Sequence, residues 1–145
     1  MRSAYRILAH LVAIGVVVQA ATLAFGIFGL WNDVDAGLVV DDNYEWNTGM
    51  MLHGAIGMLV MPFLSLLLLI VSFFAKVPRG ITLALIIFGT VILQIMLALV
   101  GFGIPAIGAL HGVNAIVILA LAIVASRRAR ATTATAADVA DVARV

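Results

Sequence analysis

Residues 80–126 read GITLALIIFGTVILQIMLALVGFGIPAIGALHGVNAIVILALAIVAS, a run of 47 residues without one charged side chain. A single membrane-spanning helix needs about 20 apolar residues, so this run is long enough for two helices. Residues that favour turns interrupt its middle: Gly101, Gly103, Pro105 and Gly108. Because the strands of a membrane barrel would alternate apolar and polar residues, the run predicts two helices, at about 81–102 and 107–126.

Two further uncharged runs precede it, at residues 7–32 and 46–75. Each is long enough for one span and predicts one helix, at about 7–30 and 50–75. Of the 145 residues, 65% are hydrophobic and 10% are charged, whereas soluble domains are about half apolar and about a quarter charged. The sequence therefore predicts an all-α integral membrane protein, an up-down bundle of four helices within residues 1–130.

The composition excludes several classes of protein. A net charge of +1 is too small for the basic face that nucleic-acid binding requires. The chain has no cysteine, so it can form neither a disulfide framework nor a thiolate metal site. The predicted spans contain no nucleophile–base pair, carboxylate dyad or phosphate-binding loop, so an enzyme acting on its own is not expected.

The charged residues predict the orientation of the bundle. All basic residues fall on one side of the four-span topology: Arg2, Arg6, Lys76, Arg79, Arg127, Arg128, Arg130 and Arg144. The loop at residues 31–49, on the other side, carries acidic residues only. By the positive-inside rule, both termini are expected in the cytoplasm and the bundle in the cell membrane. Residues 131–145 are predicted to form a weakly ordered cytoplasmic tail.

The two halves of the chain repeat one pattern. A glutamine stands seven residues before a glycine in the first and third predicted helices: Gln19 and Gly26, Gln94 and Gly101. The second and fourth helices both open with Leu-His-Gly, which places His53 and His111 at matching positions. A duplicated helical hairpin explains the pattern, and chance similarity between helices rich in Leu, Ala and Gly is the alternative. In an up-down bundle the second and fourth helices lie diagonally across the core, so both histidines are expected in its outer half.

Two facing histidines within a membrane predict a cofactor site, because ionisable side chains there are functional candidates. Neutral imidazole is a good ligand for haem iron, and ligation by His53 and His111 needs no charged residue in the membrane. A porphyrin is a flat plate, so the helix positions beside it must be small. The small residues expected to clear this space are Gly26, Gly54, Gly57, Gly101, Gly112 and Ala115. The sequence therefore predicts one haem b, with iron ligated by the two histidines.

Other interpretations of the same residues remain open. Small residues in membrane helices often serve close packing alone, and a buried histidine can simply bond to another helix. Another metal or a quinone is a further alternative to haem. Gln19 and Gln94 are expected to form bonds between helices or to line a quinone or proton path. His10 is expected to be an interfacial or packing histidine, and Asn114 to orient the ring of His111 or to bond another helix.

The Leu52-His53-Gly54 and Leu110-His111-Gly112 motifs, within residues 5–126, resemble those of one half of the haem A synthase bundle. They are similar, more loosely, to cytochrome b561-type cores, and to a family of small bacterial four-helix membrane proteins with the same two histidines. The resemblance to haem A synthases implies haem ligation by both histidines. Met50 stands where those enzymes carry a carboxylate, so the resemblance implies cofactor binding and not synthase activity.

The sequence thus predicts a b-type haem protein that takes part in electron transfer or accompanies a respiratory chain. Its expected partners, besides the lipid bilayer, are an extracytoplasmic redox protein, a quinone or a respiratory complex. A homodimer that shares ligands between chains is a further possibility. The alternative is a cofactor-free accessory or structural subunit that packs its small-residue faces against a larger complex.

Overall fold

The computed structural model describes residues 1–41 and 43–142, with side chains described up to residue 131, and contains no strand within them. Its elements are α1 (Arg2–Asp35), α2 (Thr48–Ala55), the π-helix η1 (Ile56–Val60), α3 (Met61–Ala75), α4 (Gly80–Gly101) and α5 (Pro105–Val142). Since α2, η1 and α3 are continuous, they form one membrane-length helix. The predicted all-α bundle of four long helices is confirmed.

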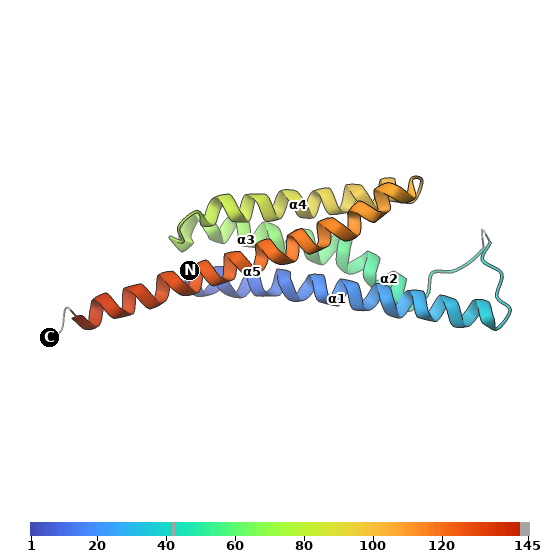
Figure 1. Ribbon diagram of the computed structural model, residues 1–145, viewed down its shortest axis with the longest axis horizontal. Helices are drawn as coiled ribbons and strands as arrows, with labels where there is room; N and C mark the ends of the chain where they lie inside the picture. Colours follow the sequence, from blue (N-terminus) through green and yellow to red (C-terminus); the bar gives the residue numbers. More distant parts are fainter. Residues whose placement is uncertain (42, 143–145) are drawn as a thin grey trace.

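The four long helices run alternately up and down, side by side (Figure 1). α1 packs against α2, α3 and α5, and α4 packs against α3 and α5. The α2–α3 helix and α5 therefore occupy diagonal positions, separated by α1 on one side and α4 on the other. This is the arrangement that brings His53 of α2 and His111 of α5 to the same level across the bundle.

The outside of the bundle is apolar along its length. Large hydrophobic side chains such as Phe25, Phe28, Phe73 and Phe74 are more than half exposed. Four helices are long and apolar enough to cross a membrane, and outward-facing apolar side chains are what a lipid environment requires. The chain therefore has the architecture of a multi-pass membrane protein.

The two ends of the bundle differ in charge. The basic end holds the start of α1, the α3–α4 turn with Lys76 and Arg79, and the arginines of α5 around Arg128. The acidic end holds the end of α1, the loop at residues 36–47 and the short α4–α5 turn at residues 102–104. At the acidic end the ring of Trp46 packs edge-on against Phe102, with centroids 5.8 Å apart.

Both ends of α1 and the end of α5 lie outside the predicted helix boundaries, and α1 begins at Arg2, about five residues before the predicted start. α1 ends at Asp35, about a turn beyond the uncharged run, because an exposed helix end tolerates the acidic residues there. α5 continues to Val142, where the sequence predicts a weakly ordered tail from residue 131. The Ala-rich composition of this segment explains the helix, since alanine is the best helix former. Residues 143–145 of the predicted tail lie outside the described residues.

A π-helical turn interrupts the second membrane helix at η1. The backbone N–H of Met61 bonds to the carbonyl of Ile56, five residues earlier, instead of four. Pro62 follows directly, and proline cannot donate to the carbonyl four residues before it, against which its ring would clash. The π turn absorbs this defect. It also separates the short α2, which carries His53, from the long and well-packed α3.

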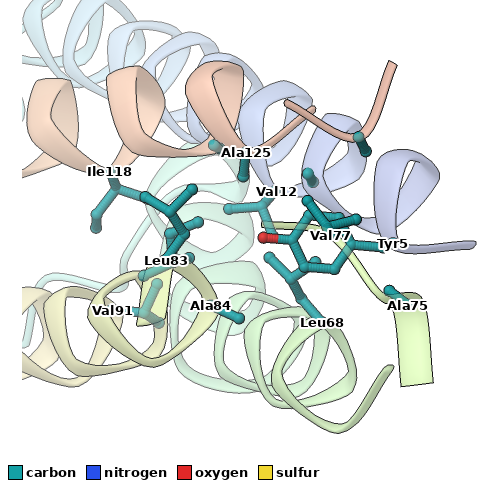
Figure 2. Packing of buried hydrophobic residues seen from close by; sticks show 14 of the residues in the cluster. Tyr5, Val12, Leu68, Ala75, Val77, Leu83, Ala84, Val91, Ile118 and Ala125 are labelled. Carbon is teal, nitrogen blue, oxygen red and sulfur yellow. The ribbon is translucent and has the colours of Figure 1, made fainter. Parts of the chain in front are cut away.

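The apolar core lies in the half of the bundle nearer the basic end (Figure 2). Tyr5 is fully buried there, and its hydroxyl donates to the carbonyl of Gly80 (3.1 Å), which ties α1 to the start of α4. The largest fully buried apolar side chains around it come from all four long helices: Val12, Leu68, Ile87, Val91 and Ile118. In the acidic half, by contrast, the buried residues among those described are two glycines and Asn114. The large buried apolar side chains are thus gathered toward one end of the bundle.

Candidate cofactor site

The structure brings His53 and His111 together in the half of the bundle nearer the acidic end. Their ring centroids are 6.1 Å apart and their planes are inclined by 61°. Both side chains are partly buried. The predicted pairing of the two histidines across the bundle diagonal is therefore what the structure has.

Each imidazole is held by one backbone carbonyl of the neighbouring helix. Nδ1 of His53 donates to the carbonyl oxygen of Gln19 on α1 (3.0 Å). Nδ1 of His111 donates to that of Gln94 on α4, also at 3.0 Å. A carbonyl oxygen can only accept, so Nδ1 carries the proton in both rings and Nε2 carries the lone pair. This is the tautomer in which metal-ligating histidines are usually held.

The same register relates both hairpins, which supports duplication over chance similarity. The bond between His53 and the carbonyl of Gln19 corresponds to the bond between His111 and the carbonyl of Gln94. The same residue spacing within each hairpin relates a second pair of contacts. A side chain on Gly26 would meet the backbone of Met50, and one on Gly101 would meet the backbone of Gly108. The two hairpins therefore share their side-chain anchors and their closest backbone approach.

The donor set and its spacing fit a haem. Two imidazoles that share one metal ion have ring centres about 6 Å apart, because each metal–nitrogen bond is about 2 Å long. Within the described residues, no three His, Cys, Asp or Glu side chains gather around a point that could hold a metal ion. Two histidines suffice for haem, whose porphyrin nitrogens supply the other four ligands.

The glycines that follow the two histidines lie on the exposed surface of the bundle. A Cβ built on Gly54 or on Gly112 meets no other atom within 4 Å, and both residues are exposed. The buried apolar cluster lies nearer the basic end than the two histidines do. Small residues on the surface thus adjoin both imidazoles.

The other small residues predicted beside the cofactor are placed differently. A Cβ on Gly26 would collide with the backbone of α2, and a Cβ on Gly101 would collide with the backbone of α5. These two glycines therefore permit close packing of the helices. A side chain at Gly57 would collide with the amide nitrogen of Gln19, which lies against it. Ala115 lies one turn after His111 and is partly buried.

A polar network surrounds His111. The side-chain amide of Gln94 donates to the carbonyl of His111 (2.9 Å). Nδ2 of Asn114 donates to Oε1 of Gln94 (2.7 Å) and to the carbonyl of Thr90 (2.9 Å). Asn114 thus bonds the neighbouring helix α4, which is one of the two roles expected for it. In the first hairpin, Oε1 of Gln19 is buried without a hydrogen-bond partner.

Sequence reasoning missed Gly49, which packs directly on the backbone of Gly26 and sets the approach of α2 to α1. It also missed the capping role of Asn47, whose side chain accepts from the backbone N–H of Met50 and donates to the carbonyl of Gly26 (2.7 Å). An asparagine just before an apolar helix is a capping signal that was available in the sequence. His10 is exposed, and its Nδ1 donates to the carbonyl of Arg6 on its own helix.

The chain was also compared with known proteins. No protein-family model, curated protein or solved structure matches it. The chemistry of the site is therefore inferred from its own residues.

Proposed function

We propose that this protein binds one b-type haem in the membrane, with His53 and His111 as the axial ligands, and takes part in electron transfer. One observation carries the proposal: the ring centroids of the two imidazoles lie 6.1 Å apart, although His53 and His111 belong to diagonally placed helices. Their identical Nδ1–carbonyl bonds support it, since each leaves Nε2 as the metal-binding nitrogen. Haem supplies one-electron redox chemistry when bound.

The protein's own residues fix the ligands before any cofactor arrives. The carbonyls of Gln19 and Gln94 hold each ring in one tautomer and one orientation, and such bonds raise the basicity of the ligating nitrogen. The rigid core in the other half keeps α1 and α4 in place. Binding therefore costs little reorganisation, because the donors are preorganised.

The position of the site favours a partner at the acidic end. By the positive-inside rule, the basic end is cytoplasmic and the acidic end faces outward. A single redox centre in the outward half cannot carry electrons through the whole membrane. We therefore infer exchange with an extracytoplasmic redox protein, a quinone or a respiratory complex in the cell membrane.

The proposal is tested by titrating detergent-purified protein with haem b and following absorbance. We expect saturation at one haem per chain, because the structure contains one His53–His111 pair. Replacing Gly54 or Gly112 by leucine is expected to lower haem affinity about tenfold or more, since a bulky side chain then projects from the residue next to each ligand. Circular dichroism is expected to show unchanged helicity, because both positions have room for a side chain.

The alternative, a cofactor-free accessory subunit, predicts another result. In that case the exposed Gly54 and Gly112 would form a face for packing against a partner helix. Haem would then bind without defined stoichiometry, and neither leucine variant would change the titration. That pair of results would contradict the haem proposal.

A further inference from the structure

The two histidines are anchored with different strength, and His111 is the more firmly held. Its Nδ1 bonds the carbonyl of Gln94, while the side chain of Gln94 bonds back to the carbonyl of His111. Asn114, one turn on, bonds both Gln94 Oε1 and the carbonyl of Thr90. Four hydrogen bonds therefore join α4 and α5 within two turns of this imidazole.

His53 has a single bond of this kind, to the carbonyl of Gln19. That carbonyl also accepts from the hydroxyl of Thr22 (3.1 Å), so the imidazole shares its acceptor. The position that matches Asn114 is Ile56, which has no donor to offer, and Oε1 of Gln19 is left buried without a partner. The imidazole of His53 thus lacks the network that surrounds His111.

The two helices that carry the histidines are also built differently. α2 has eight residues and passes directly into the π turn at Ile56–Val60, whereas α5 is α-helical on both sides of His111. Both helices make a close backbone contact with the preceding helix, α2 at Gly26 and α5 at Gly101. The difference between the two ligands therefore lies in the hydrogen bonds around each imidazole.

We propose that His53 is the exchangeable axial ligand, and that a small neutral ligand such as carbon monoxide replaces it while His111 stays bound. This inference rests on the haem proposal above. In the exchange the bond between iron and Nε2 of His53 breaks, and its electron pair returns to the nitrogen. The lone pair on carbon of the incoming ligand forms the new bond, and ferrous iron keeps its oxidation state. The side chain of His53 moves aside, and His111 with its network does not.

The test measures carbon monoxide binding to the dithionite-reduced, haem-loaded protein, by absorption spectroscopy. We expect wild type to bind it, and His53→Ala to retain haem and bind it at least about ten times faster, since no ligand has to leave. His111→Ala is expected to lose most of its haem, because the remaining ligand is the weakly anchored one. Haem content is a readout separate from any redox activity.

A second variant tests the cause of the difference. Ile56→Asn places a donor at the position that matches Asn114 in the other hairpin, and Gln19 Oε1, the counterpart of the Gln94 oxygen that Asn114 bonds, has no partner. We expect it to lower carbon monoxide affinity about threefold, the effect of one interhelical hydrogen bond of about 0.6 kcal/mol. Ala55→Asn adds the same side chain at an exposed neighbouring position and serves as the matched control.

The possible outcomes separate this inference from the haem proposal. Wild type that takes up no haem overturns both. Wild type that binds haem with both histidines but no carbon monoxide overturns the inference alone. The same holds if His111→Ala keeps its haem while His53→Ala loses it, or if Ile56→Asn changes affinity no more than Ala55→Asn does.

Discussion

The double variant His53→Ala, His111→Ala is expected to lose haem binding while keeping its fold. Removal of a residue that only hydrogen-bonds a metal ligand lowers metal affinity by up to about 100-fold. Removal of both ligands is therefore expected to lower haem affinity by at least that factor. The bundle is expected to remain helical, since the apolar core lies in the other half of the molecule. Haem content and circular dichroism of the purified variant measure the two effects.

His10→Ala is the matched control for this experiment. His10 is exposed and bonds only its own helix through Arg6, so its removal is expected to leave haem content at the wild-type level. Equal haem content in the double variant and in wild type would mean that the histidine pair does not ligate haem. Loss of helicity in the double variant would instead assign the pair a structural role.

Gly49→Ala is expected to destabilise the bundle by about 2 kcal/mol, within the range for overpacked interiors. The added methyl group would collide with the backbone of Gly26 and lie 2.8 Å from the carbonyl of Thr22. Backbone atoms cannot rotate away as a flexible side chain can, so α2 and α1 must separate. The midpoint of unfolding in a denaturing detergent, followed by circular dichroism, measures the loss.

Gly54→Ala provides the comparison on the same helix. Its added methyl group meets nothing within 4 Å, and alanine is a better helix former than glycine by about 1 kcal/mol. We expect its unfolding midpoint to equal or exceed that of wild type. If Gly49→Ala and Gly54→Ala shift the midpoint alike, the close contact between α1 and α2 does not contribute to stability.

Most of the fold could be predicted from the sequence, because the membrane imposes a simple rule on composition. Uncharged runs located all four long helices, and the turn residues around Pro105 divided the longest run correctly. The lack of bulky apolar residues after Ala131 does not by itself reveal that α5 continues as a helix, which the helix propensity of alanine favours. The π turn before Pro62 was also missed, since proline alone does not reveal which hydrogen-bond register will absorb it.

The pairing of the histidines could be predicted because the duplicated motif and the up-down topology together determine their positions. Their anchors could not, since backbone carbonyls leave no trace in the sequence. Gln94 does form the expected bond between helices, whereas the side chain of Gln19 does not. Glycines that open space and glycines that permit close packing look alike in a sequence, so the roles of Gly26 and Gly54 emerge only from the structure.

The most direct test of the haem proposal is an absorption spectrum of wild-type protein purified from haem-replete cells, dithionite-reduced minus oxidised. The facing imidazoles of His53 and His111 predict the spectrum of a six-coordinate, low-spin b-type haem at one haem per chain. A colourless protein from such cells would contradict the proposal, and so would a haem spectrum that persists in the double histidine variant.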